Sequence, residues 1–178
     1  QTWNKELVKK VGKVIGTENL NTCDFLDTIS NFNAVTCTAM QDLRVNPLSG
    51  RYDEGFGEDG TLVSEMVDAM ATGASGIEEE ENEDGFWTKC IVTTKHYTDY
   101  AGQQFRRSAN IANSLRSVME QQAKNIKKGI SDGSVSGFMT SYGRTAGIPN
   151  SLSPLVQWIQ SFAPWGEDGG NYVVTDYS

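Results

Sequence analysis

The sequence predicts a mainly α or α+β fold, with helices packed on one long central helix at about residues 101–128, one or two short strands, and long glycine-rich loops. Apolar residues recur at three- and four-residue spacing through 101–128, which is typical of a buried helix face. Only residues 86–100 concentrate β-branched and aromatic side chains, as strands do. Glycine-rich or acidic stretches at 46–60, 73–85 and 129–150 separate these elements and predict loops.

The first half of the chain is expected to be helical. Residues 2–15 place apolar side chains on one face and lysines on the other, and Gly16 is expected to end this helix. Residues 22–43 predict a second helix with a kink near 31–33, and residues 61–70 predict a short third one.

The second half contains the strand and the long helix. The strand at 86–100 needs a partner, because a single strand is not stable; residues 171–177 and a neighbouring subunit are the candidates. The helix at 101–128 is expected to end at Gly129. A short apolar helix follows at about 153–162.

Length and composition narrow the class of protein. The 178 residues fit a single domain, 1–178, in which the terminal segments 1–16 and 151–178 are candidates for extended arms. The net charge of −8 argues against a nucleic-acid partner. No run of 18 apolar residues occurs, so no transmembrane segment is expected. Because the chain begins at Gln1 rather than Met, we expect a removed leader and an exported protein, whether periplasmic, extracellular or on a virion surface.

Charges are segregated along the chain. Twelve acids and no Lys or Arg lie between Tyr52 and Thr88, whereas residues 89–128 carry eight bases and two acids. One interpretation is a solvated surface with internal complementarity; the other is docking onto protein partners in a homo- or hetero-oligomer. Aromatic residues near both termini are candidate anchors of such an interface. The candidate interface residues are Trp3, Glu78, Glu79, Glu80, Glu81, Arg106, Arg107, Arg116, Lys124, Lys127, Trp158, Phe162 and Trp165.

Three cysteines, Cys23, Cys37 and Cys90, allow one disulfide at most. On one continuous helix, Cys23 and Cys37 would be about 21 Å apart, beyond the reach of a disulfide. A Cys23–Cys37 bridge therefore requires the helix to break between them, and three reduced thiols are the alternative. The chain has no CxxC pair, which argues against a zinc site.

Candidate catalytic and metal-binding residues are few. His96 is the only histidine, and an ordinary surface position on a strand is expected for it. A weak calcium site is suggested by the carboxylates of a glycine-rich loop, although they miss the EF-hand register. The candidate ligands are Asp53, Glu54, Glu58 and Asp59. No other cofactor is expected.

Three functional hypotheses follow. Three long loops in so small a chain are most easily explained if neighbouring molecules order them. The first hypothesis is therefore a non-enzymatic structural or adaptor subunit of an exported assembly, such as a secretion, pilus-like or virion component, without catalytic residues. The second is a small secreted hydrolase that uses carboxylates, with the loops lining its cleft. The third is a calcium-dependent binding module.

Overall fold

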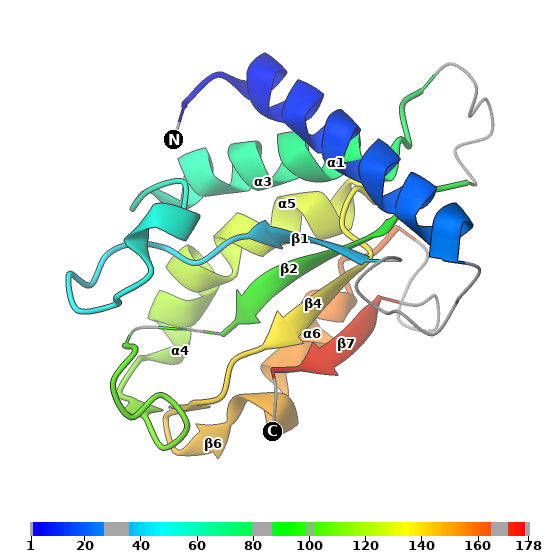
Figure 1. The fold of residues 1–178 in the computed structure, drawn as a ribbon. Coiled ribbons are helices and arrows are strands. Elements are labelled where there is room, and N and C mark those ends of the chain that lie inside the picture. The colour runs from blue at the N-terminus through cyan, green and yellow to red at the C-terminus, as the bar shows by residue number, and fades with distance from the viewer. Residues whose placement is uncertain are drawn as a thin grey trace.

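The computed structural model describes residues 2–26, 36–79, 87–98, 100, 102–164 and 171–176, with only the backbone at 23–26 and 36–38. Its centre is a sheet of four parallel strands (Figure 1). In order across the sheet these are β1 (Thr36–Met40), β2 (Ile91–Tyr97), β4 (Gly137–Thr140) and β7 (Tyr172–Thr175).

Helices connect successive strands of this sheet. The α-helices are α1 (Lys5–Leu26), α3 (Gly60–Ser75), α4 (Leu115–Ser117), α5 (Lys124–Ser131) and α6 (Leu155–Gln160). Single turns of other helix types are η1 (Tyr52–Glu54), η2 (Val118–Gln122) and η3 (Asn150–Leu152). A second, small sheet joins β3 (Asn110–Ile111), β5 (Arg144–Thr145) and β6 (Ile148–Pro149).

The order of the strands across the main sheet is the same as their order along the chain. Crossovers between parallel strands are almost always right-handed, so strands that advance in one direction place all their connecting helices on one face. This is the topology of four consecutive units of a β/α barrel. The expectation of a mainly α or α+β fold around one long helix is therefore wrong: the architecture is α/β, built on a parallel sheet.

The core lies between this sheet and the helices. Val92 and Phe138 from β2 and β4 pack against Val67 of α3, Ile126 of α5 and Ile159 of α6, and all five side chains are at most 1% exposed. Burying each such side chain contributes about 1.5–3 kcal/mol relative to leaving it exposed. Because the core is shared between β2, β4 and three helices, the relative positions of these strands are determined by side-chain packing as well as by backbone hydrogen bonds.

Residues 101–128 do not form one helix. The segment runs through β3, the short α4, the π-type turn η2 and the start of α5. A π-type turn adds a residue to the helical repeat and rotates the faces on either side of it. Leu115 and Met119, expected on the buried stripe, are 60% and 41% exposed, whereas Val118 is buried.

The expected helix at 22–43 is also wrong. Helix α1 continues through Gly16 to Leu26, and β1 begins at Thr36. A short buried strand of a parallel sheet has the same run of apolar residues as a buried helix segment, so its pattern does not distinguish the two. The strand expected at 86–100 is confirmed as β2, and the one expected at 171–177 is confirmed as β7, although β7 pairs with β4.

Glycines allow α1 and α3 to pack at backbone distance. A Cβ atom on Gly16 would lie 2.1 Å from the carbonyl oxygen of Ala74, and one on Gly12 would lie 2.3 Å from that of Met70. Gly73 presents the reverse contact, 2.1 Å from the carbonyl oxygen of Lys9. Gly16 therefore serves as a packing position in mid-helix, which is why it does not end α1.

We expect Gly16→Ala to destabilise the protein even though alanine is the better helix former by about 1 kcal/mol. The added methyl group forces the two helices apart, at a net cost of about 1–3 kcal/mol. Each kcal/mol lowers Tm by about 2–4 °C in a chain of this size. Gly102→Ala is the control, because its Cβ would meet nothing within 4 Å. An unchanged or higher Tm in Gly16→Ala would contradict this account.

Ion pairs reinforce the same helix contact. Lys5 pairs with Glu65, and Lys9 with Glu78. Glu79 accepts from Lys89 at 2.6 Å and lies 3.2 Å from Lys13. The hydrogen bond from Lys89 is the largest cause that holds the pKa of Glu79 below its ordinary value. Part of the charge segregation along the sequence is thus neutralised within the chain itself.

Candidate functional site

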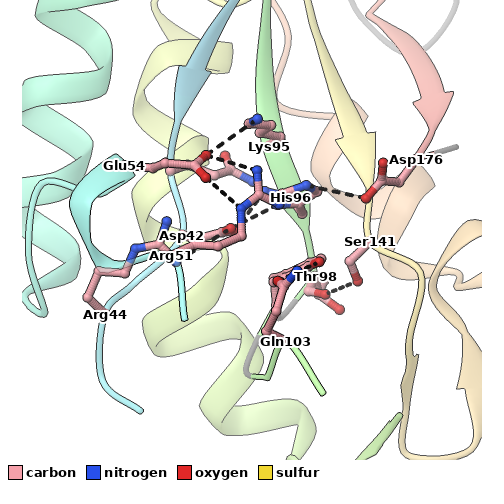
Figure 2. Close-up of polar contacts among 12 residues, drawn as sticks. Asp42, Arg44, Arg51, Glu54, Lys95, His96, Thr98, Gln103, Ser141 and Asp176 are labelled. Atoms are coloured by element: carbon pink, nitrogen blue, oxygen red, sulfur yellow. Dashed lines mark hydrogen bonds and ion pairs between the residues drawn. The ribbon is translucent and has the colours of Figure 1, made fainter. Parts of the chain in front are cut away.

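The carboxyl ends of the four parallel strands meet at one edge of the sheet, where β/α barrels carry their active sites. Asp42 follows β1, His96 lies near the end of β2, Tyr142 follows β4, and Asp176 follows β7. The backbone N–H of Asp176 donates to the carbonyl of Thr140 at 3.1 Å, which continues the β4–β7 ladder and places the Asp176 side chain at this edge. Figure 2 shows Glu54, Lys95, His96 and Asp176 across the strand ends.

His96 is buried and held between two carboxylates, contrary to the expected surface position. Its backbone N–H donates to Asp42 Oδ1 at 2.7 Å, and its Nδ1 lies 2.8 Å from Asp42 Oδ2. Its Nε2 lies 3.4 Å from Asp176 Oδ2 (Figure 2). Its ring stacks on that of Tyr100, with the ring centres 4.4 Å apart. Each ring nitrogen of His96 therefore faces a carboxylate oxygen.

A second group of charges adjoins this histidine. Arg51 donates two hydrogen bonds to Glu54, of 2.6 and 2.9 Å, and Lys95 Nζ lies 3.6 Å from the same carboxylate. The hydrogen bond from Arg51 is the largest cause that lowers the pKa of Glu54, and the reciprocal bond raises the pKa of Arg51. Glu54 is therefore ionised and fully engaged, and it positions two cations beside His96.

Tyr142 contacts the other side of Asp176. Burial and the charge of the Asp176 carboxylate, to which the phenol is hydrogen-bonded, raise the pKa of Tyr142. The phenol therefore stays protonated at neutral pH and can donate to the carboxylate. The guanidinium carbons of Arg106 and Arg107 lie 5.2 and 5.8 Å from the centre of the Tyr142 ring.

A buried hydrogen-bond network fixes the strand ends that present these groups. Asn150 Nδ2 donates to the carbonyl of Thr98 at 2.9 Å and to the hydroxyl of Ser141, and its Oδ1 accepts from Thr145 at 2.8 Å. Ser141 in turn donates to the carbonyl of Thr98 at 2.9 Å. These hydrogen bonds connect the segment after β2, the segment after β4 and strand β5. Tyr142 directly follows Ser141, so this network fixes the backbone beside it.

Three carboxylates lie at the site, and their environments differ. The Asp42 side chain is 4% exposed, and both its oxygens accept from His96. Glu54 has both oxygens occupied by Arg51 and Lys95. The Asp176 side chain is 16% exposed and has donors on two sides. Asp176 is thus partly exposed and oriented by His96 and Tyr142, whereas Glu54, whose side chain is 34% exposed, has both oxygens engaged by cations.

The expected interface residues are not gathered on one surface. Lys127 lies over the Phe162 ring at 3.9 Å, and Trp158 packs edge-on against the same ring. Arg116 pairs with Glu120 on the surface, Lys124 is exposed at the start of α5, and Trp3 is 74% exposed before α1. Glu78 and Glu79 belong to the helix contact described above. Glu80, Glu81 and Trp165 lie outside the described residues.

The candidate calcium ligands are divided among other roles. Asp53 and Glu54 lie on η1, where Glu54 pairs with Arg51. Asp59 caps α3 by accepting from the backbone N–H of Leu62 at 2.7 Å. Within the described ranges, no group of three His, Cys, Asp or Glu side chains is arranged to hold a metal ion. Cys23 lies in α1 and Cys37 in β1, but their side chains are outside the described part. Cys90 is buried, and its thiol donates to the carbonyl of Ala74 at 3.4 Å.

The chain is similar to glycosidases of much greater length. No protein-family model matches it. The "Putative beta-xylosidase" of Formosa agariphila is 27% identical over 183 residues, which cover 98% of this chain and 21% of that protein. The solved beta-glucosidase of Kluyveromyces marxianus and the beta-glucosidase DesR of Streptomyces venezuelae each match at 20% identity with a TM-score of 0.76, over 98% of this chain and 19% of theirs.

A GH3 exo-beta-xylosidase, solved in complex with a xylobiose aziridine activity-based probe, matches with a TM-score of 0.73 at 22% identity. That match covers 97% of this chain and 22% of the xylosidase. The chain thus spans about a fifth of the length of these relatives. At such identities the solved structures show the fold alone, which is α/β with a parallel sheet.

These findings contradict the hypothesis of a non-enzymatic structural or adaptor subunit. The relative and the structural neighbours are a xylosidase and glucosidases, and no structural or secretion component appears among those compared above. The expectation that the protein is not an enzyme, and its description as an oligomeric structural protein, are overturned with it. The hypothesis fails because the segments at 46–60 and 129–150, which it requires a partner to order, contain η1, β4, β5 and β6 of the fold itself.

Sequence reasoning missed the residues that form the site: Arg51, Lys95, Tyr142 and Asp176 were not singled out as functional. The available signal was a polar residue directly after each short apolar run, as in the Tyr172–Asp176 segment. That signal has meaning only when the runs are recognised as parallel strands, because only then do their ends share one edge.

Proposed function

We propose that the chain provides part of the active site of a β-glycoside hydrolase, in which Asp176 is the nucleophile. The observation that carries the proposal is the Asp176 carboxylate, which directly follows the parallel strand β7 and is oriented by His96 and Tyr142. Glycosidases cleave with carboxylates, and the similarity to xylosidase and glucosidases supports this class. The proposal takes up the second sequence hypothesis, a carboxylate-based hydrolase.

Each group has a role in this reaction. An Asp176 oxygen attacks the anomeric carbon while the bond from that carbon to the leaving oxygen breaks, and the leaving oxygen takes a proton from a general acid. Water then attacks the same carbon, its proton passes to the conjugate base, and Asp176 is released. His96 and Tyr142 hold the carboxylate, whereas Lys95 and Arg51 present cationic donors suited to sugar hydroxyls.

The general acid is the missing element among the described residues. Both oxygens of Asp42 are engaged by His96, and the hydrogen bond from Arg51 lowers the pKa of Glu54, which keeps Glu54 ionised. A β/α barrel also has eight strands, whereas the main sheet described here has four. We infer that groups outside the described residues supply the acid and close the site, so substrates with good leaving groups are the appropriate probes.

An aziridine of xylose configuration tests the nucleophile directly. The carboxylate opens the strained ring, the carbon–nitrogen bond breaks, the nitrogen takes up a proton, and an ester to the protein remains. We expect peptide mass spectrometry to place one adduct on Asp176, and Asp176→Asn to remain unlabelled.

Asp132→Asn is the matched control, because Asp132 is an exposed carboxylate paired with Lys128 on α5. It should be labelled like the unmodified protein. An adduct on another residue, or no adduct with either xylose- or glucose-configured aziridines, would refute Asp176 as nucleophile.

Export and association with protein partners stay predictions. The outer side of α1 carries apolar side chains that are 44–57% exposed at Leu7, Val11 and Val14. Such a face favours a neighbour, whether a further part of the same protein or another chain. Within the described part of the chain, no helix is both long and apolar enough to cross a membrane.

A further inference from the structure

Two arginines stand at the rim of the candidate site. The guanidinium carbons of Arg106 and Arg107 lie 5.2 and 5.8 Å from the centre of the Tyr142 ring, and the Tyr142 hydroxyl is hydrogen-bonded to the Asp176 carboxylate. One tyrosine side chain therefore separates both cations from the proposed nucleophile. A group attached to a sugar bound at Asp176 would be within reach of them.

Neither cation is neutralised by the described part of the chain. Three other arginines lie within 4 Å of a carboxylate there, namely Arg44 with Asp42, Arg51 with Glu54 and Arg116 with Glu120. No described carboxylate lies within the 4 Å of an ion pair from Arg106 or Arg107. Their contacts with the face of an aromatic ring leave the hydrogen-bond donors of the guanidinium groups available for an anion.

The backbone holds this segment in place. Phe105 adopts a left-handed conformation with φ of 56°, and the N–H of Ser108 returns to the carbonyl of Phe105 at 2.9 Å, so the chain turns tightly around the two arginines. The carbonyl of Ala109 then accepts from the N–H of Arg144 at 2.9 Å, which anchors the turn to the small sheet beside Tyr142. Hydrogen bonds within the turn and to the small sheet therefore hold the segment that contains Arg106 and Arg107.

We propose that the substrate is an acidic saccharide, with a carboxylate or sulfate group on one of the two sugars that flank the scissile bond, and that Arg106 and Arg107 bind that group. This rests on the proposed glycosidase function. Guanidinium groups match carboxylate and sulfate oxygens with paired hydrogen bonds. The chain as a whole has a net charge of −8 and repels anions, so an acidic substrate requires local cations of this kind at the site.

The test compares substrates that differ only in charge. One arm uses 4-nitrophenyl β-D-glucuronide against 4-nitrophenyl β-D-glucoside, which places the acid on the sugar that is cleaved. The other uses β-xylosyl-(1→4)-glucuronic acid against β-xylosyl-(1→4)-glucose, which places it on the leaving sugar. In one of these arms we expect the acidic substrate to have the higher kcat/KM.

Arg106→Gln combined with Arg107→Gln should reduce the acidic-to-neutral ratio of kcat/KM at least about tenfold, because charge-assisted hydrogen bonds are lost. The preference should also weaken as salt is raised. Arg116→Gln is the control with the same charge change on an exposed arginine, and it should leave the ratio unchanged.

Other outcomes separate the two proposals. Equal losses on acidic and neutral substrates would mean that the arginines only support Tyr142, and would overturn this inference. Hydrolysis of neutral glycosides without any acidic preference would also overturn it while leaving the glycosidase proposal intact. If no glycoside is cleaved, the glycosidase proposal fails, and calorimetry with glucuronate and glucose then tests the arginine site by itself. Binding of glucuronate that the double variant loses would support an acidic-saccharide site. Absence of glucuronate binding would reject such a site.

Discussion

Asp176→Asn should lower kcat on 2,4-dinitrophenyl β-D-xyloside or β-D-glucoside by at least about 10³-fold, because an amide cannot attack the anomeric carbon. Each factor of ten corresponds to about 1.36 kcal/mol of activation free energy. The dinitrophenyl leaving group departs without a proton, so the effect reports the nucleophile and not the general acid. KM should change much less than kcat.

Two comparisons show whether this loss is chemical. Asp132→Asn removes a carboxylate of the same type from the surface ion pair with Lys128 and should retain full activity. Asp176→Gly leaves a space in which added azide can attack the anomeric carbon, so turnover should return with azide and produce a glycosyl azide. A kcat within about tenfold of the unmodified protein in Asp176→Asn would remove Asp176 from the mechanism.

Asp42→Ala should have the second large effect, on stability and activity together. The Asp42 side chain is 4% exposed and accepts from the backbone N–H and the Nδ1 of His96. Its loss leaves two buried donors of His96 unpaired and a buried Arg44, whose guanidinium lies 4.0 Å away, without its nearest carboxylate. Breaking a buried pair of this kind costs about 3–5 kcal/mol of the free energy of unfolding, measured by denaturant titration.

Asp42→Asn separates the catalytic contribution from the structural one. The amide oxygen can still accept from the His96 backbone, but the amide nitrogen is a donor and cannot accept a hydrogen bond from Nδ1 as the carboxylate does. Asp42 then no longer orients the imidazole ring toward Asp176. We expect kcat to fall about 10²-fold, with a smaller loss of stability than in Asp42→Ala.

Asp68→Asn is the control for stability. Asp68 accepts from Lys128 at 2.7 Å and from Ser134 at 2.8 Å, between α3 and α5 and apart from the strand-end cluster. It should lose stability but keep its kcat. If Asp42→Asn behaves in the same way as Asp68→Asn, Asp42 only supports the fold.

Local patterns predicted some elements well and others not at all. Residues 91–97 combine β-branched and aromatic side chains in a run too long for a turn, so β2 could be identified. Gly137–Thr140 is a strand of four residues that begins with glycine. The sequence predicts a loop there, because glycine weakens a strand pattern. Here Gly137 is required by packing, since a Cβ atom would lie 2.5 Å from the Tyr172 ring.

The site was less predictable than the fold. The sequence identifies His96 only as the single histidine. Its contact with Asp42, which lies 54 residues earlier in the chain, is visible only in the structure. Asp176 is one of 23 Asp and Glu residues, and nothing in the sequence distinguishes it until the strand before it is placed in the sheet. A glycosidase needs particular carboxylates in particular places, and composition says nothing about place.

The sequence by itself determined the amphipathic helix that begins near residue 5, the strand centred on residue 94, and the charge complementarity that α1 and α3 later satisfy. The tertiary structure alone decided the order and direction of the strands. Parallel pairing joins segments that are distant along the chain and separated by helices, so no local pattern of side chains encodes which strands become neighbours. That pairing brings Asp42, His96 and Asp176 to one edge, and the chemistry of the protein depends on it.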